Sequence, residues 1–188
     1  MAAVLNVPNA ITLARFALVP VLAWALLDGE QALAFALFVV SALSDAADGL
    51  IARRWNLRTR FGAVADPLAD KLPMLTVGVL LAWQGTLPWW LVLAIVLRDA
   101  VIVGGALTYH LWIGSVEIAP RWLSKLNTAL EFALLLGVLA VGAGYVDDGV
   151  WRDVLLAATL ATIVASGADY VLVWSRKAAQ ARRAAVSR

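Results

Sequence analysis

The sequence predicts an all-helical integral membrane protein whose six transmembrane helices form one bundle. Hydrophobic residues make up 63% of its 188 residues and charged residues 15%, and the mean hydropathy is +0.85. Because soluble domains are roughly half apolar and a quarter charged, this composition indicates a membrane protein. A bilayer core about 30 Å thick requires roughly 20 apolar residues per helix. Such stretches run from Val7 to Leu27, Gln31 to Ile51, Val64 to Trp83, Trp89 to Leu111, Trp122 to Tyr145 and Val150 to Trp174.

The ends of these spans are marked by tryptophan. Eight of the nine tryptophans lie near predicted span ends, as in the interfacial belts of membrane proteins. The connections are short, so we expect residues 1–188 to form a single membrane domain without a separate soluble part. The N-terminus lacks the basic region of a signal peptide and the Arg- and Ser-rich pattern of a transit peptide. We therefore expect the first span to be retained in a bacterial cytoplasmic (inner) membrane.

Lys and Arg are concentrated in alternate connections, and this bias predicts the orientation. The other connections carry acidic residues or none, apart from Arg152. The basic residues are Arg53, Arg54, Arg58 and Arg60 after the second span, Arg121 and Lys125 after the fourth, and Arg176, Lys177, Arg182, Arg183 and Arg188 in the tail. Both termini are therefore expected in the cytoplasm. The basic face would meet anionic membrane lipids, and the pI of about 9.3 requires no nucleic-acid partner.

Four aspartates lie where charge is costly and usually functional, at the ends of apolar spans. Asp45 and Asp48 end the second span, and Asp66 and Asp70 open the third. Spacings of three and four put each pair on one helix face, and a hairpin would bring the two faces together near the cytoplasmic interface. Bare carboxylates would repel one another and take up protons. Carboxylates with phosphate oxygens are usual ligands of Mg²⁺, so metal and phosphate are predicted together.

A second interpretation is that these aspartates cap helices or pair with nearby arginines. Their neighbours favour the metal site, because Gly49 and Gly62 leave room for a bulky ligand to approach the backbone. Arg53 adds a fixed fork of donors for phosphate. Glycine alone would mean little, since it also serves helix packing in membranes.

An eight-residue signature extends over residues 45–70. Its members are Asp45, Asp48, Gly49, Ala52, Arg53, Gly62, Asp66 and Asp70, in the pattern D-x2-D-G-x2-A-R-x8-G-x3-D-x3-D. This pattern resembles the signature of the CDP-alcohol phosphotransferase family without a departure in residue or spacing. The family's entry to the first span, PN-x-x-T-x-x-R, is also matched, by Pro8, Asn9, Thr12 and Arg15. The six expected spans and the cytoplasmic termini match the family as well, so the resemblance covers essentially the whole chain.

The resemblance implies an enzyme that transfers a substituted phosphate from a CDP-alcohol to an acceptor hydroxyl and releases CMP, in a site open to the cytoplasmic leaflet. It implies two Mg²⁺ or Mn²⁺ ions, which would offset charge on the attacking and leaving oxygens. Their ligands would be Asp45, Asp48 and Asp66, with Asp70 acting as base, ligand or both. The implied CDP-binding residues are Asp48, Gly49, Ala52, Arg53 and Gly62. A homodimer is also implied.

Two branches of the family share the signature and differ in the acceptor. Arg98-Asp99 and the segment SKLNTA at residues 124–129 resemble the RD and SK-x-NT-A segments of cardiolipin synthases, which join CDP-diacylglycerol to phosphatidylglycerol. The alternative is a phosphatidylglycerophosphate synthase, which uses glycerol 3-phosphate and more typically has RE and GK-x-KT. The acceptor phosphate is predicted to contact Arg98, Arg121 and Lys125, although snorkelling to the interface explains Arg121 equally well.

A non-enzymatic divalent-ion or lipid transporter is the remaining alternative. A transporter would need carboxylates near the bilayer midplane and no nucleotide pocket. The aspartates instead lie at the cytoplasmic edge beside Gly49, Arg53 and Gly62. The sequence therefore favours the enzyme.

Overall fold

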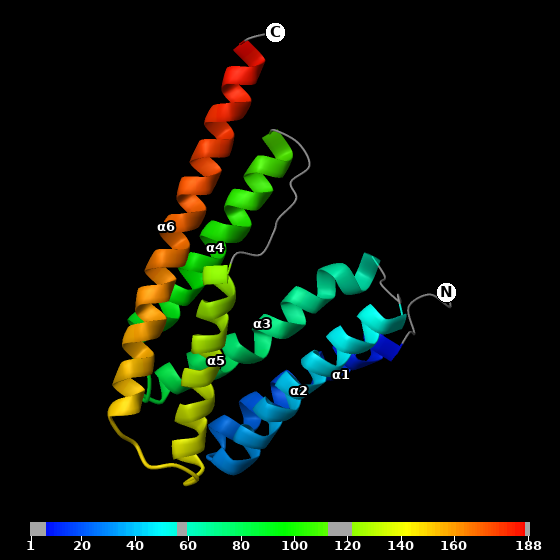
Figure 1. The fold of residues 1–188 in the computed structure, drawn as a ribbon. Helices are drawn as coiled ribbons and strands as arrows, with labels where there is room; N and C mark the ends of the chain where they lie inside the picture. The colour runs from blue at the N-terminus through cyan, green and yellow to red at the C-terminus, as the bar shows by residue number, and fades with distance from the viewer. Residues whose placement is uncertain (1–6, 56–59, 113–121, 187–188) are drawn as a thin grey trace. The chain divides into compact units, whose positions relative to one another are not determined.

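The computed structural model describes the backbone of residues 7–55, 60–112 and 122–186, and the side chains of residues 14–44, 71–105 and 122–173. The described residues form six α-helices and no strand (Figure 1), which confirms the all-helical prediction. The helices are α1 (Val7–Leu27), α2 (Gln31–Trp55), α3 (Arg60–Trp83), α4 (Trp89–Trp112), α5 (Trp122–Gly142) and α6 (Val150–Val186).

Most helices begin where the hydropathy predicts. The starts of α1, α2, α4, α5 and α6 coincide with the predicted span starts, whereas α3 begins at Arg60 instead of Val64. At their other ends, α2 continues past Ile51 and α6 continues to Val186. Arg, Lys, Gln and Ala are good helix formers. The helices therefore run on into polar segments, where an apolar stretch ends before the helix does.

Three connections share one backbone motif at the end of α1, α3 and α5. Gly29, Gly85 and Gly144 have φ angles of 81°, 75° and 73°, which glycine adopts without steric cost. After α5, the Gly144 N–H donates to the Val141 carbonyl and the Tyr145 N–H donates to the Ala140 carbonyl, each at 2.9 Å. This pair of bonds is a Schellman motif, and it closes α5 at Gly142, before the predicted end at Tyr145.

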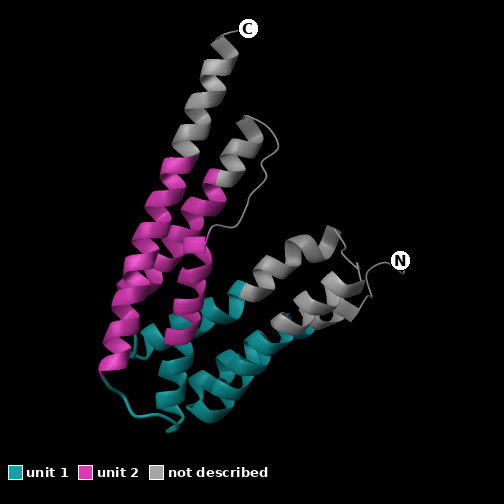
Figure 2. Ribbon diagram, in the orientation of Figure 1, with its two compact units in different colours: residues 1–88, 135–149 teal, residues 89–134, 150–188 magenta. Residues whose placement is uncertain are grey.

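The chain divides into two compact units (Figure 2). Unit 1 comprises residues 1–88 and 135–149, and unit 2 comprises residues 89–134 and 150–188. In unit 1, α1 packs against both α2 and α3. Ala25 and Ala34 are fully buried there, and such small residues allow helices to approach closely in membranes. In unit 2, α4 packs against α6, with Leu91, Ile163 and Tyr170 buried.

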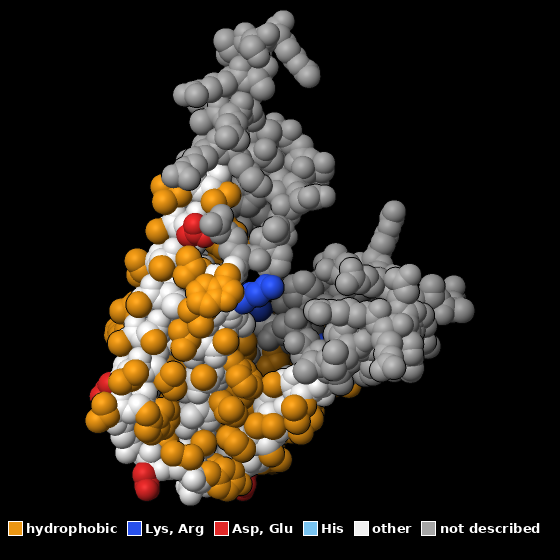
Figure 3. Space-filling view, viewed as in Figure 1, with side chains coloured by type: hydrophobic (Ala, Val, Ile, Leu, Met, Phe, Trp, Pro, Cys, Tyr) orange, Lys and Arg blue, Asp and Glu red, His pale blue; other side chains and the backbone are white. Residues whose placement is uncertain are grey.

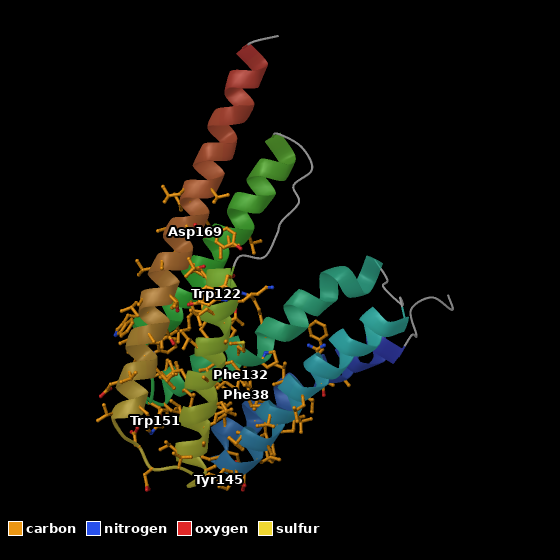
Figure 4. The ribbon with its side chains drawn as sticks, viewed as in Figure 1. Phe38, Trp122, Phe132, Tyr145, Trp151 and Asp169 are labelled. Atoms are coloured by element: carbon orange, nitrogen blue, oxygen red, sulfur yellow. The ribbon has the colours of Figure 1, made fainter. Side chains whose placement is uncertain are left out.

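One end of unit 1 joins all of its helices. The Gln84 side chain, just after α3, donates its Nε2–H to the Leu26 carbonyl of α1 at 2.7 Å. The rings of Phe35 on α2 and Tyr145 after α5 meet edge to face, with centroids 5.2 Å apart; Tyr145 is labelled in Figure 4. The end of α1, the start of α2 and the end of α3 therefore provide a common reference for heights along these helices.

On the face that Figure 3 shows, apolar side chains cover much of the described surface. Leu27, Leu97 and Trp83 are 63%, 66% and 74% exposed, whereas soluble monomers rarely expose large apolar patches. Among the described side chains, two helical stretches are long and apolar enough to cross a membrane, Trp122–Gly142 and Val150–Val173. Both findings support membrane association, and the bundle of six spans remains a prediction.

Candidate functional site

The signature residues lie on a helical hairpin of unit 1. Asp45 and Asp48 belong to the last part of α2, Asp66 and Asp70 belong to the first part of α3, and the two helices contact each other. The CDP-binding candidates also lie here, with Gly49, Ala52 and Arg53 on α2 and Gly62 on α3. The side chains of residues 45–70 lie outside those that the structure describes. The backbone positions alone therefore define this part of the site.

The two aspartate pairs lie at matching heights. At a rise of 1.5 Å per residue, Asp45 is about 21 Å from the start of α2, and Asp70 is about 20 Å from the end of α3. Asp48 and Asp66 are each about 26 Å from the same helix ends. The antiparallel hairpin thus has two acidic layers about 5 Å apart, Asp45 with Asp70 and Asp48 with Asp66.

These layers fit the donor set of a divalent metal site. Carboxylate oxygens are the hard ligands that Mg²⁺ prefers, and similar ligands suit Mn²⁺. Among the described side chains there is no other group of three or more His, Cys, Asp or Glu residues that could hold a metal ion. The aspartate hairpin is therefore the candidate metal centre.

Arg15 is a buried cation at the height of one acidic layer. It is 1% exposed and lies twelve residues before the end of α1, about 18 Å from the common end of the unit. The described acidic residues of unit 1 all lie at that common end, and they are Asp28, Glu30, Asp147 and Asp148. A buried guanidinium requires anionic or hydrogen-bonding partners. On the helices that contact α1, the acidic positions nearest in height to Arg15 are Asp45 and Asp70.

Arg98 is the buried arginine of unit 2, and it links three helices. Its side chain is 4% exposed, and its Nη1 donates to Asp99 Oδ1 at 2.7 Å. Its Nη2 donates to Ser124 Oγ on α5 at 2.6 Å and to Ser166 Oγ on α6 at 2.9 Å. The Nε of Arg98 has no hydrogen-bond partner among the residues described. The guanidinium thus ties α4 to both neighbouring helices.

A second polar contact lies one turn further along α5. Asn127 is fully buried; its Nδ2 donates to Glu131 Oε1, and its Oδ1 accepts from Thr162 Oγ1 on α6 at 2.9 Å. Glu131 is only 6% exposed. Ser124, Asn127 and Glu131, at spacings of three and four, therefore form a polar stripe along one face of α5. Figure 4 labels Trp122, which begins this helix.

The other predicted acceptor contacts differ in their placement. Lys125 is exposed in the first turns of α5, directly after Ser124. Arg121 lies outside the described residues. Sequence reasoning assigned no chemistry to Ser124 by itself, to Ser166 or to Glu131, although it placed Ser166 on a helix-packing face. The spacing of the α5 stripe and the rarity of an acidic residue within an apolar span were the signals that could have identified Glu131.

Comparison with known proteins agrees with the signature. The family model of CDP-alcohol phosphatidyltransferases matches residues 5–174. The cardiolipin synthase (CMP-forming) of Streptomyces coelicolor is 37% identical over 152 residues, which cover 76% of this chain and 69% of that protein. The human cardiolipin synthase (CMP-forming) is 28% identical over 181 residues, 88% of this chain and 60% of that protein.

A relative from the other branch is similar to a comparable degree. The Mycobacterium tuberculosis protein named "Probable phosphatidylglycerophosphate synthase" is 32% identical over 177 residues, 90% of this chain and 82% of that protein. The hairpin signature and these matches lead to one conclusion. The chain belongs to the CDP-alcohol phosphatidyltransferase family and is a phosphatidyltransferase enzyme.

Proposed function

We propose that the protein transfers the phosphatidyl group of CDP-diacylglycerol to a hydroxyl of phosphatidylglycerol, giving cardiolipin and CMP in a metal-dependent reaction. The observation that carries the proposal is the pair of acidic layers on the α2–α3 hairpin in a chain of this family. The choice of acceptor is supported by the segments Arg98-Asp99 and SKLNTA. Two similar relatives named cardiolipin synthase also support it.

In this proposal the acidic layers bind the donor diphosphate through metal. Asp45, Asp48 and Asp66 would hold two Mg²⁺ or Mn²⁺ ions, which when bound offset charge on the attacking and leaving oxygens. Gly49, Ala52 and Gly62 leave space for the cytidine diphosphate. Arg53 would supply a fork of N–H donors for its phosphates.

Asp70 is the proposed base. It accepts the proton of the acceptor hydroxyl, while that oxygen forms a bond to the phosphatidyl phosphorus. The bond from this phosphorus to the CMP oxygen breaks, and CMP leaves with the electron pair. Arg15, at the height of Asp45 and Asp70, is proposed to balance part of the negative charge of this acidic layer, because a buried guanidinium is stabilised by an anionic partner.

The acceptor phosphate is proposed to bind the cations at the beginning of α5. Lys125 is exposed there, and Arg121 is close to it in sequence. Arg98 is buried and hydrogen-bonded to Ser124, the residue before Lys125. Both possible acceptors carry a phosphate, so these cations suit either branch of the family.

Phosphatidylglycerophosphate synthesis is the second candidate, favoured by the 32% identity to a relative named for that activity. The purified protein with CDP-diacylglycerol and Mg²⁺ should be given phosphatidylglycerol, glycerol 3-phosphate, inositol phosphate or serine in separate assays of CMP release. Release with phosphatidylglycerol alone is expected. Release with glycerol 3-phosphate alone would replace the acceptor and keep the mechanism. Release with none would contradict both candidates.

The proposed setting is a homodimer with six spans in a bacterial cytoplasmic membrane and both termini in the cytoplasm. The chain has no cysteine, so single cysteines report sidedness without background. In intact cells, a cysteine at Asp148 should react with an impermeant maleimide, and one at Ser187 should react only after lysis. The opposite pattern would reverse the orientation, and the mass of the detergent complex would test the dimer.

A further inference from the structure

Arg98 joins α4, α5 and α6, and we infer that it positions Lys125 for acceptor binding instead of binding the acceptor phosphate itself. The inference rests on the proposed function and refines the role predicted for Arg98 from the sequence. We refer to four residues as the clamp: Arg98, Asp99, Ser124 and Ser166. Each of the three helices contributes at least one clamp residue, and two of the four, Arg98 and Ser166, are buried.

The hydrogen bonds of Arg98 leave too few free N–H groups on one edge of its guanidinium to bind a phosphate. Binding a phosphate through two parallel bonds requires two free N–H groups on one edge of the guanidinium. Both hydrogens of Nη2 are used, by Ser124 and Ser166. A phosphate at this nitrogen would have to displace a serine from a side chain that is 4% exposed.

The charge of Arg98 is also balanced within the clamp. Asp99 Oδ1 lies 2.7 Å from Nη1, and this carboxylate would repel an approaching phosphate. An apolar interior tolerates an ion pair when the two charges balance each other and additional hydrogen bonds satisfy the remaining polar groups. The clamp is therefore suited to holding helices together, which Ser and Thr also do in membrane bundles.

The clamp acts on the part of α5 that carries Lys125. Ser124 and Lys125 are consecutive residues near the beginning of the helix at Trp122. Ser124 takes the bond from Arg98, while the Lys125 side chain is exposed. Loss of the clamp would loosen the first turn of α5 and displace the ammonium group of Lys125. Electrostatic binding of a phosphate is sensitive to such a displacement.

The Asn127 contact allows the effect of the clamp on acceptor binding to be separated from an effect on folding. The bond between Asn127 and Thr162 joins α5 to α6 one turn beyond the clamp, so α5 remains attached when Arg98 is replaced. Thr162→Val removes this second contact without touching the clamp. It is therefore the matched control, and it should leave the KM for the acceptor unchanged.

The test measures kcat and both KM values for full-length variants, with whichever acceptor supports CMP release by the unmodified protein. Arg98→Gln and Arg98→Lys should both raise the acceptor KM by about 10-fold, equivalent to about 1.4 kcal/mol, with the KM for CDP-diacylglycerol unchanged. Lysine is not expected to restore the clamp, because its compact ammonium group lacks the planar fork with which the guanidinium reaches Asp99 and both serines. Ser124→Ala and Ser166→Ala should each raise the acceptor KM about threefold.

Combining Arg98→Gln with Lys125→Gln decides whether Arg98 positions Lys125 or binds the acceptor phosphate itself. If Arg98 acts through Lys125, the effect of Lys125→Gln shrinks in the Arg98→Gln background, because interacting residues are not additive. Full additivity would show an independent contact and overturn the inference. A normal acceptor KM for Arg98→Lys, Ser124→Ala and Ser166→Ala would overturn it as well. Should Arg98→Gln not fold, the two serine variants combined with Lys125→Gln give the same decision.

The outcomes also separate this inference from the proposed function. If only glycerol 3-phosphate supports turnover, the cardiolipin assignment fails, while the clamp is tested with that acceptor. If the unmodified enzyme turns over phosphatidylglycerol and the serine variants match it in acceptor KM, the function stands and the clamp fails.

Discussion

Unit 1 and unit 2 each bury an arginine, and the two side chains differ in what surrounds them. Arg15 is 1% exposed at the height of Asp45 and Asp70, on the helix that packs against both arms of the aspartate hairpin. Arg98 is 5% exposed and is neutralised by Asp99, with its other bonds to serines. The same residue type therefore suits an acidic centre in one unit and a helix clamp in the other.

The comparison shows why burial alone does not identify a catalytic cation. A buried charge in a membrane protein is expensive and indicates function by default. Its role depends on whether the balancing charge is fixed within the protein or can be shared with substrate. For Arg98 the balance is complete within unit 2. For Arg15 we propose that it involves Asp45 and Asp70, the acidic positions nearest to it in height.

The largest expected effect concerns the acidic layers. Asp66→Asn and Asp70→Asn should each reduce CMP release by at least about 1000-fold, because the first removes a proposed metal ligand and the second removes the proposed base. Thermal unfolding in detergent without metal should not become easier, since each change removes repulsion between carboxylates. Asp153→Asn, at an exposed acidic residue of α6, is the control with normal activity. Normal CMP release by both variants would refute the catalytic assignment.

Replacement of Arg15 tests the other side of the comparison. Arg15→Gln should lower kcat by about 100-fold, a typical cost of removing one charge-stabilising group from an active site. The Mg²⁺ concentration for half-maximal activity should fall or stay constant, because carboxylates without a neighbouring cation attract metal more strongly. Arg152→Gln, outside the hairpin, should leave both values unchanged. An unaltered kcat for Arg15→Gln would mean that Arg15 is only a packing residue.

A smaller effect is expected for the polar contacts of unit 2. Thr162→Val should lower the free energy of unfolding by about 1 kcal/mol, within the range measured for hydrogen bonds between membrane helices. Thr159→Val is the matched control on the same helix, because Thr159 is fully buried and its Oγ1 has no partner among the described residues. That change should be neutral or stabilising. Equal destabilisation of the two variants in denaturant titrations would contradict a role for the Asn127 contact.

An effect of similar size is expected at the turn that closes α5 in unit 1. Gly144 has a φ of 73°, and a Cβ there would meet nothing within 4 Å. Gly144→Ala should therefore lower stability by about 1 kcal/mol through backbone strain alone. Gly167→Ala also has free space for a Cβ, but it lies within α6 and should not destabilise the protein. A drop in stability for both variants would show that steric contacts, not the φ angle, cause the loss.

Much of the fold could be predicted because apolar length is a local property. Five helix starts coincide with the predicted span starts, and the spacing of the four aspartates placed them on two arms of one hairpin. The helix ends of α2 and α6 were missed because propensity carries a helix beyond its apolar stretch. The early end of α5 was missed because a left-handed glycine, not polarity, terminates it.

The sequence by itself determined the family signature, the helical class and the candidate metal ligands, since all of these depend on residue type and on spacing along one or two neighbouring helices. Only the tertiary structure decided which buried polar groups meet across helices. Arg98 and Ser166 are 68 positions apart in the chain, and their bond of 2.9 Å depends on how α4 packs against α6. Spacing along a helix predicts which face a residue occupies, but it does not predict which helix packs against that face.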